Sequence, residues 1–450
     1  MKNKILNIYY SILAYFAKIY IKKHKPYIIG INGSVGKTSC RMIIYQTLQK
    51  FITNKKIYTS SKNFNGELGL SLSIFQIENF YPSLTLFISV FFKILRKTIF
   101  SSKPYDILIL EYGIDRPKEM EFLLKIANPH IGIFTAIDSV HSQQFGDPAQ
   151  IAKEEIKMIK NTLEIAFLNE NDAYAMQLIH QINIDYFTYQ TLGHESKADI
   201  SFSDIHFQSD GYLPILSEFN LKIKNQKYNI QTNLIGKPNY GYIGVALAIA
   251  QILAYKFNNI SNLNFDDLEL EYLLQAGRFS IFAGISKSII FDSSYNSSPL
   301  SVRKIIDTVY NIQKEIFPKR KIWFLLGDMR ELGDLTEKEH RLLAGYVSQT
   351  ADRLFLVGEN MINHLSDELQ KVGYDKKLIY KFHKSTDAGE VIAKMLKDNP
   401  DEILLICKGS QNTIFLEEGI KKLLNNSEDE KYLTRQSKWR IKTKNNFFQS

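Results

Sequence analysis

The stretch that decides the fold class reads Ile28-Ile29-Gly30-Ile31-Asn32-Gly33-Ser34-Val35-Gly36-Lys37-Thr38-Ser39. A β-rich apolar run enters a glycine-containing loop that ends in Gly-Lys-Thr, and a helical segment follows. Backbone N–H groups of such a loop curl around phosphates, Lys37 reaches the β- and γ-oxygens, and the Thr38 hydroxyl can hold Mg²⁺. The usual spacing G-x-x-x-x-G-K-[ST] needs glycine at position 31, which is isoleucine, so a shorter G-x-x-G-K-T stands here. The stretch predicts nucleotide binding.

Short apolar runs alternate with helical segments along most of the chain. They are Tyr27–Ile31, Ile107–Leu110, Ile131–Phe134, Ile165–Leu168, Ile289–Phe291, Ile322–Leu326, Leu354–Val357 and Ile403–Ile406. Because the runs are continuous rather than alternating, they are typical of strands buried on both faces of a parallel sheet. Residues 198–234 favour antiparallel strands, and a new strand–helix series begins after Gly277-Arg278. We predict an α/β protein with a parallel-sheet, P-loop central ATPase domain over residues 26–277 and a smaller Rossmann-like C-terminal domain over residues 278–425.

Composition narrows the class of protein. The 450 residues are 45% hydrophobic and 23% charged, which is typical of a globular chain and excludes a disordered or fibrous one. The two cysteines, Cys40 and Cys407, form no disulfide framework or zinc-site spacing, and they favour a reducing compartment. The net charge of +9 indicates anionic partners such as phosphates or lipid head groups. No nucleic-acid-binding motif accompanies that charge, so we expect no nucleic-acid partner.

Two segments read as basic amphipathic helices: residues 1–25 and residues 84–100. The apolar part of the first, from Ile5 to Ile21, is 17 residues long and would span about 25 Å, short of a bilayer core of about 30 Å. An interfacial helix on an anionic membrane therefore fits better than a spanning one. The alternative is a helix packed on the protein's own body. We expect a basic, solvated tail over residues 426–450; its cationic cluster, which would otherwise touch lipid or RNA, is Arg435, Lys438, Arg440, Lys442 and Lys444 with Trp439.

Six blocks of sequence, in order, resemble the Mur ligase superfamily from about residue 26 to residue 425. Within it they resemble most the branch that adds D-alanyl-D-alanine to UDP-N-acetylmuramoyl-tripeptide. Besides the phosphate loop, the blocks are Asn63-Phe64-Asn65-Gly66-Glu67-Leu68-Gly69, Leu110-Glu111-Tyr112-Gly113, His141-Ser142-Gln143-Gln144-Phe145-Gly146, Asp292-Ser293-Ser294-Tyr295-Asn296-Ser297-Ser298-Pro299, Leu326-Gly327-Asp328-Met329-Arg330-Glu331-Leu332-Gly333 and Lys408-Gly409-Ser410.

The resemblance implies an ADP-forming, ATP-dependent carboxylate–amine ligase in which ATP and Mg²⁺ convert a carboxylate into an acyl phosphate that an amine attacks. It implies catalytic roles for Lys37, Glu111, His141 and Glu155, and magnesium ligation by Thr38, Glu111 and His141. The nucleotide-binding residues that it implies are Gly33, Ser34, Gly36, Lys37, Thr38, Ser39, Asn239, Arg278 and Asp292. The substrate-binding residues are Asn63, Asn65, Asn296, Asp328, Glu331 and Lys408, although Asp328 and Glu331 equally suit loop caps.

The chain departs from the family pattern at several positions. Glu155 stands where many members carry a carbamylated lysine, unless the block is shifted and Lys153 or Lys157 serves. Pro238 and Tyr242 replace a histidine and a base-contacting asparagine, which suggests that a tyrosine stacks on the base. In addition, Ser293 replaces a family aspartate and Gln411 a family arginine.

The phosphate loop begins by residue 33, so we expect the family's separate UDP-sugar-binding domain to be absent. The acceptor would then be recognised by its peptide end, or as a lipid-linked precursor at the membrane. We expect a cytoplasmic enzyme of peptidoglycan biosynthesis that contacts the inner face of the plasma membrane. Two alternatives remain: another amino-acid ligase of the superfamily, of the folylpolyglutamate or poly-γ-glutamate type, and a membrane-surface ATP-binding scaffold without turnover.

Overall fold

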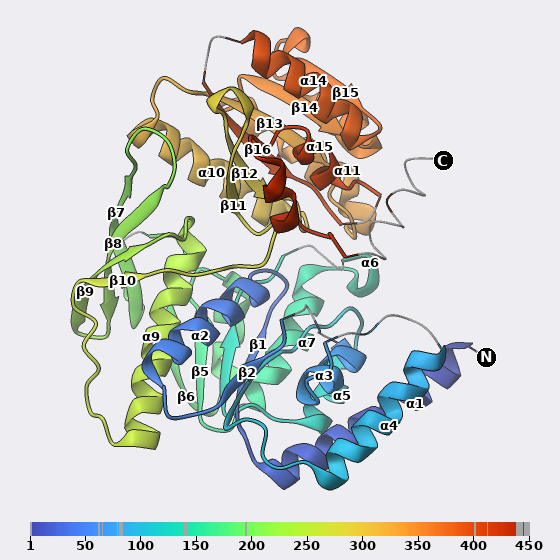
Figure 1. The fold of residues 1–450 in the computed structure, drawn as a ribbon, viewed down its shortest axis with the longest axis vertical. Helices are drawn as coiled ribbons and strands as arrows, with labels where there is room; N and C mark the ends of the chain where they lie inside the picture. The colour runs from blue at the N-terminus through green and yellow to red at the C-terminus, as the bar shows by residue number, and fades with distance from the viewer. Residues whose placement is uncertain are drawn as a thin grey trace.

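Two mixed sheets, each with its own helices, make up the protein (Figure 1). The computed structural model describes residues 2–61, 64, 66–78, 80, 84–138, 142–193, 196–399, 402–411, 413–437 and 444. The first sheet has the order β10-β9-β8-β7-β6-β5-β4-β1-β3-β2 and the second β11-β12-β16-β13-β14-β15. The predicted α/β fold class is confirmed.

The first sheet is parallel from β2 to β7 and antiparallel through β7, β8 and β9. Its strands are β1 (Tyr27–Asn32), β2 (Ile57–Thr59), β3 (Ile107–Glu111), β4 (Ile131–Phe134), β5 (Ile165–Asn169), β6 (Asp185–Tyr189), β7 (Ile200–Gln208), β8 (Leu216–Ile223), β9 (Gln226–Thr232) and β10 (Leu268–Leu270). The antiparallel strands expected within residues 198–234 are thus present.

Helices cover both faces of the first sheet. They are α1 (Lys2–His24), α2 (Lys37–Phe51), α3 (Gly66–Ile74), α4 (Leu84–Phe100), α5 (Glu119–Ile126), α6 (Ser142–Phe145), α7 (Pro148–Lys160), α8 (Ala173–Leu178) and α9 (Lys237–Asn258). Alternate residues of β1 enter two different cores: Ile29 and Ile31 pack with α2 and α9, whereas Ile28 packs on the side of α1 and α3. Among the described residues, α9 is the helix long and apolar enough to cross a membrane, and 72% of its apolar window is buried in the protein.

The second sheet is parallel except for its edge strand β11. Its strands are β11 (Ser280–Ala283), β12 (Ile289–Ser293), β13 (Lys321–Gly327), β14 (Arg353–Val357), β15 (Ile379–Phe382) and β16 (Ile403–Lys408). The helices around it are α10 (Pro299–Ile316), α11 (Thr336–Leu342), α12 (Ala344–Val347), α13 (Ser366–Lys371), α14 (Ser385–Asp398) and α15 (Leu416–Lys421). Each apolar run that we took for a strand lies within a strand of one of the two sheets.

The two amphipathic helices pack on the body and on each other. Helix α1 buries Leu13, Ala17 and Tyr20 and contacts α3, α4 and α5. One face of α1 is therefore packed on the body of the protein, which was the alternative to a membrane-surface helix. Helix α4 lies beside α1 at the edge of the first domain, which is built on the first sheet as the second domain is built on the second (Figure 1). Both helices still present apolar side chains to solvent, among them Ile8 and Phe92.

The expectation of a solvated tail is wrong at three buried residues of the described C-terminal segment, Leu433, Thr434 and Lys444. A 3₁₀ helix, η6, spans Ser427–Tyr432, and the chain beyond it returns to the second domain. Leu433 and Thr434 are buried, as is Lys444, because they pack against that domain. The other lysines of the predicted cationic cluster, with Trp439 and Arg440, lie outside the described residues.

Candidate active site

The phosphate loop joins the buried strand β1 to the first turn of α2. Gly33 and Gly36 have φ angles of +118° and +90°, a conformation that residues with a side chain rarely adopt. A β-carbon on Gly36 would lie 2.1 Å from the Tyr242 hydroxyl oxygen. The segment that follows β4 also fixes the loop, since Ser34 N and Val35 N donate to Ala136 O at 2.7 and 3.3 Å. The backbone is therefore pre-shaped around the N-terminus of α2, where anions bind.

Lys37 and Thr38 begin α2 and face the cleft. The Lys37 Nζ atom donates to the carbonyl oxygens of Gly33 and, at 3.3 Å, of Ser34. The Thr38 Oγ1 atom lies 3.3 Å from Oε2 of Glu111. Because β3 ends at Glu111 beside β1, the carboxylate emerges at the same sheet edge as the loop.

A second partner of Glu111 was missed by sequence analysis. The Arg41 Nε atom lies 2.6 Å from Oε1 of Glu111, and both side chains are 3% exposed. Arg41 also donates to Thr59 Oγ1 at 3.0 Å and to the Ser60 carbonyl. Its position one helical turn after Lys37 was the available signal, because residues four apart share a helix face.

Glu155 lies on α7, beneath the phosphate loop. Its Oε2 atom accepts from Asn32 Nδ2 at 2.9 Å, and its carboxylate also accepts from the Gly33 N–H. Burial raises the pKa of Glu155 to about 7, against the opposing effects of nearby Lys37, the Gly33 N–H and Asn32. The carboxylate is thus positioned to support the loop and to respond to charge placed on it.

The second domain supplies the opposite wall. The Arg278 guanidinium lies over the Tyr295 ring, 4.3 Å from its centroid, and burial lowers the pKa of Arg278. Tyr295 N donates to Gly277 O at 3.0 Å, which ties the turn after β12 to the start of the second domain. Asp292 is fully buried behind this turn, and burial raises its pKa to about 6.

Lys408 ends β16 and reaches the same turn. Its Nζ atom donates to Ser293 O at 3.2 Å, to Ser293 Oγ at 3.3 Å and to the Asn296 carbonyl. Burial, with a contribution from Arg278, lowers the pKa of Lys408 to about 7. Through these hydrogen bonds the Lys408 amino group holds the turn that forms part of the cleft wall.

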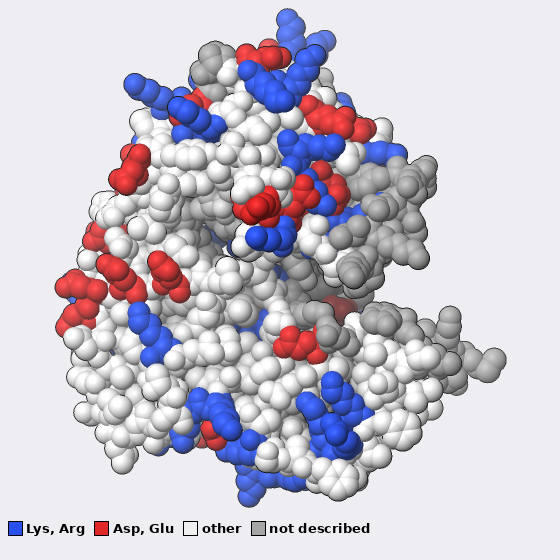
Figure 2. Space-filling model, viewed as in Figure 1, with Lys and Arg blue, Asp and Glu red and all other residues white. Residues whose placement is uncertain are grey.

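Both domains line one cleft of about 950 Å³, and the surface is hollowed between them (Figure 2). The predicted site residues that line it are Ser34, Gly36, Lys37, Thr38, Ser39, Glu111, Asn239, Arg278, Asn296, Glu331 and Lys408. Gly33 and Glu155 lie just beneath the loop. His141, Asn63 and Asn65 lie outside the described residues.

Asp328 is not brought to the cleft. Its carboxylate accepts from Met361 N at 2.8 Å, from Asn360 Nδ2 at 3.1 Å and from Asn360 N at 3.3 Å. These contacts cap the segment that follows β14. The loop-cap alternative therefore describes Asp328, because its oxygens already accept from that segment.

Tyr242 is not a stacking platform in this structure. The side chain is 3% exposed and its ring belongs to the core between the first sheet and α9. Only the hydroxyl end reaches the phosphate loop, at Gly36, and burial raises the pKa of that hydroxyl. The replacement of asparagine by tyrosine here packs the loop from behind.

The cleft suits phosphates and a magnesium ion. The buried polar atoms without a protein partner include Asn32 Oδ1 and Ser34 Oγ at the loop and Arg278 Nε and Ser297 Oγ at the opposite wall. No group of three or more His, Cys, Asp or Glu side chains within the described residues could form a metal cage. Magnesium at phosphates needs only one or two protein oxygens, because substrate and water complete its shell. Thr38 and Glu111 meet that requirement.

Comparisons with known families agree with this arrangement. The Mur ligase middle domain matches residues 31–250, and the glutamate ligase domain of Mur ligases matches residues 277–411. The chain belongs to the Mur ligase family. Together the two matches cover most of this Mur ligase and place the phosphate loop in the first domain and Arg278 in the second.

Two relatives of this Mur ligase share one name. The UDP-N-acetylmuramoyl-tripeptide--D-alanyl-D-alanine ligase of Borreliella burgdorferi is 26% identical over 409 residues, covering 89% of this chain and 75% of that protein. The ligase of the same name from Bacillus subtilis is 25% identical over 356 residues, covering 77% and 66%. The predicted absence of a UDP-binding domain stays a prediction.

Solved structures share the fold. MurF from Acinetobacter baumannii superposes with a TM-score of 0.70 at 17% identity, covering 92% of this Mur ligase and 80% of that chain. MurF ligase from Thermotoga maritima in complex with ADP gives a TM-score of 0.69 at 20% identity, covering 95% and 85%.

Proposed function

We propose that this Mur ligase joins a peptide carboxylate to an amine with ATP, and that the pair is UDP-N-acetylmuramoyl-tripeptide and D-alanyl-D-alanine. The observation that carries the proposal is the cleft itself. It combines Lys37, Thr38 and Glu111 from one domain with Arg278 from the other. The branch follows from the name that the relatives share.

The reaction has two balanced steps. A carboxylate oxygen of the acceptor attacks the γ-phosphorus of ATP, the bond to the β–γ bridging oxygen breaks, and ADP leaves. The amine nitrogen then attacks the acyl carbon, phosphate leaves with the acceptor's oxygen, and the nitrogen gives up one proton. The protein need only neutralise phosphate charge and hold the reactants in line.

The residues of the phosphate loop would carry the first step. The Gly33–Gly36 backbone and the N-terminus of α2 would bind phosphate oxygens. Lys37 would donate to phosphate oxygens in place of the Gly33 and Ser34 carbonyls. Thr38 and Glu111, with the predicted ligand His141, would hold Mg²⁺, which neutralises phosphate charge when bound. Glu155 would keep the loop in shape through Asn32 and Gly33.

The second domain would complete the site. Arg278 projects into the cleft with its Nε atom unpartnered, and it would bind charge that develops on the transferred phosphoryl group. Asn239 and Asn296 would contact the nucleotide and the acceptor respectively, because they line the cleft on opposite domains. Lys408 would act mainly by holding the Ser293–Asn296 turn.

The test is ADP release by the purified chain with Mg²⁺. We expect release to require both UDP-N-acetylmuramoyl-tripeptide and D-alanyl-D-alanine, with one amide product per ADP by mass spectrometry. Lys37→Ala should abolish release while the fold persists. Release that ignores either substrate, or an amide that forms only with a folate or a glutamate polymer, would contradict the proposal.

We further propose that the enzyme works in the cytoplasm against the inner face of the plasma membrane, through α1 and α4. The two helices lie in parallel, since the Tyr9 hydroxyl donates to Phe87 O and Lys23 Nζ donates to Thr98 O near their C-terminal ends. Their outer faces carry exposed apolar side chains: Ile8, Ile12, Tyr15, Ile88, Phe92, Ile99 and Phe100.

Charge favours an anionic bilayer as the occupant of that face. Neither helix contains Asp or Glu, whereas Lys18, Lys22, Lys93 and Arg96 are exposed beside the apolar side chains. Basic residues around an apolar strip are typical of helices that lie in the plane of a membrane surface.

Flotation with vesicles tests this contact. We expect the full chain to float with phosphatidylglycerol vesicles and not with phosphatidylcholine vesicles, and Ile8→Asp/Phe92→Asp to stay at the bottom. Leu273→Asp is the matched control, because Leu273 is exposed on a different part of the domain. Loss of a solution dimer in Ile8→Asp/Phe92→Asp, without any flotation of the unmodified chain, would assign the face to a second copy instead.

A further inference from the structure

The C-terminal segment around Arg435 lies against the entrance to the second domain. Thr434 packs on the interdomain residue Gly277, where an added β-carbon would come within 3.2 Å of Thr434 Cβ. Gly277 has a φ angle of +71°, so this close approach depends on glycine. The segment therefore touches the point at which the chain passes from one domain to the other.

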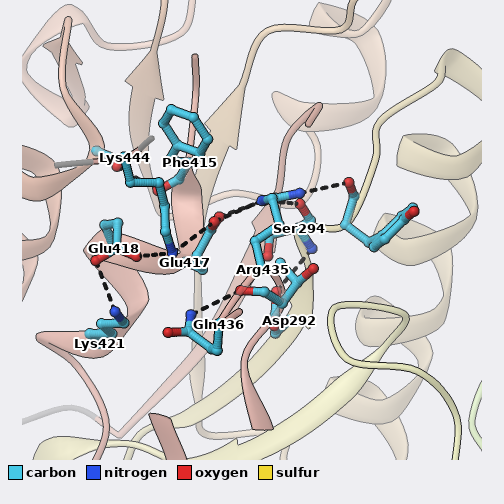
Figure 3. Close-up of polar contacts among 12 residues, drawn as sticks. Asp292, Ser294, Phe415, Glu417, Glu418, Lys421, Arg435, Gln436 and Lys444 are labelled. Atoms are coloured by element: carbon cyan, nitrogen blue, oxygen red, sulfur yellow. Dashed lines mark hydrogen bonds and ion pairs between the residues drawn. The ribbon is translucent and has the colours of Figure 1, made fainter. Parts of the chain in front are cut away.

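The Arg435 side chain makes polar contacts on two sides, with Glu417 and with the Ser294–Tyr295 turn (Figure 3). On one side its Nε atom donates to Glu417 Oε1 at 2.7 Å, and its guanidinium also pairs with the other Glu417 oxygen. On the other side it donates to the carbonyls of Ser294 and Tyr295, each at 3.0 Å. The side chains of Arg435 and Glu417 are 6% and 0% exposed, so the guanidinium and the carboxylate pair in a site with little water.

Arg435 donates to the Ser294–Tyr295 turn, and the same turn contacts Arg278. Tyr295 stacks on the Arg278 guanidinium and donates its N–H to Gly277 O. A continuous set of contacts thus runs from Glu417 on α15, through Arg435 and the Ser294–Tyr295 turn, to the arginine in the cleft. Nothing in this path is contributed by the phosphate loop.

We propose that Arg435, anchored by Glu417, is a positioning residue that holds the Ser294–Tyr295 turn and thereby aims Arg278 into the cleft. This inference rests on the proposed function for its kinetic consequences, because Arg278 is assigned there to the transferred phosphoryl group. The C-terminal segment is accordingly part of the working enzyme.

The geometry requires arginine. A lysine could keep the ion pair with Glu417, but a single ammonium group cannot replace a planar fork that reaches two carboxylate oxygens and two carbonyls. Misplacing a catalytic group by about 1 Å costs roughly 100-fold in rate. We therefore expect Arg435→Lys to lose kcat while retaining most of the charge pairing.

Lys444 provides a matched control. It also donates to Glu417 Oε1, at 3.4 Å, and to Glu418, and it is equally buried, but its ion pairs within the described part of the chain go to these two glutamates and not to the turn. Lys444→Met disturbs the same buried carboxylate as a change at Arg435. A purely structural role for Arg435 predicts similar behaviour from the two variants.

The kinetic experiment compares Arg435→Lys, Arg435→Met and Lys444→Met in the full chain. We expect kcat to fall about 10- to 100-fold for both Arg435 variants with KM for the amine nearly unchanged, and less than threefold for Lys444→Met. In an Arg278→Ala background, Arg435→Met should add less than twofold, because the two act through one path. Independent, multiplicative losses would overturn the inference.

A second measurement does not depend on turnover. Hydrogen exchange of the peptide spanning residues 292–298 should accelerate at least tenfold in Arg435→Met and stay unchanged in Lys444→Met. If the free protein lacks ligase activity but shows this pattern, the proposed function fails and the positioning role stands. Unchanged exchange in Arg435→Met would overturn the positioning role whatever the activity.

Discussion

The Nε atom of Arg41 lies 2.6 Å from Oε1 of Glu111, and the pair is almost completely buried. The carboxylate that the proposal assigns to magnesium is therefore also a structural ion pair. Its second oxygen remains directed at Thr38, 3.3 Å away. One carboxylate oxygen of Glu111 thus pairs with Arg41 inside the fold, and the other faces Thr38 at the cleft.

Removing that charge should separate the two roles. Glu111→Gln leaves the Arg41 guanidinium buried without its anion, which we expect to cost about 3 to 5 kcal/mol of unfolding free energy. The double variant Arg41→Met/Glu111→Gln should recover most of that stability and still lack Mg²⁺-dependent ADP release. Denaturant unfolding and magnesium titrations measure the two effects; a stable, active Glu111→Gln protein would contradict the dual role.

Glu155 should make stability depend on pH in a defined window. Its pKa is about 7 in the folded protein against an ordinary value of 4.5, so the folded state holds the proton more tightly. The favourable contribution is complete below pH 4.5 and is lost as pH rises through about 7. Relative to Glu155→Gln, the unmodified protein should lose about 3 kcal/mol of unfolding free energy between pH 4.5 and pH 8. Urea titrations of both proteins test this; a difference that does not change with pH would refute it.

Gly36 should not tolerate a side chain. An alanine there would strain a backbone at φ +90° and would place Cβ 2.1 Å from the Tyr242 hydroxyl oxygen. We expect Gly36→Ala to weaken binding of a non-hydrolysable ATP analogue at least tenfold, and Gly36→Ala/Tyr242→Phe to recover part of it. Calorimetric titration gives the affinities. Tyr242→Phe alone serves as the control, with an expected change below threefold.

Asp328 should matter for stability and not for substrate affinity. Asp328→Ala removes the acceptor of the Met361 and Asn360 N–H groups, at an expected cost of about 1 to 3 kcal/mol of unfolding free energy. KM for both substrates should change less than twofold. A large rise in KM for the amine without loss of thermal stability would return Asp328 to the substrate site.

The sequence predicted the buried parallel strands because their apolar runs are continuous. It missed β2, β10, β11 and β15, which are sheet edges, and β6, whose first residues are exposed. Half-exposed or very short strands carry little hydrophobic pattern to read. The order of strands across each sheet needed the three-dimensional structure.

The local part of the site was predictable because loop and strand-end positions carry their own signal. Lys37, Thr38 and Glu111 lie where a phosphate loop and a parallel strand deliver them. Arg41 was missed and Arg435 was assigned to a solvated tail, because their partners Glu111 and Glu417 are 70 and 18 residues away in the sequence. A buried ion pair between distant segments leaves no periodic trace in either one.

The central claim is that the acceptor carboxylate is activated by phosphoryl transfer in this cleft. The most direct test uses acceptor labelled with ¹⁸O in its reacting carboxylate, with ATP, Mg²⁺ and D-alanyl-D-alanine. The account predicts one ¹⁸O atom in inorganic phosphate for each amide formed, and none in Lys37→Ala because no product appears. Label recovered in AMP, or phosphate released without label, would contradict it.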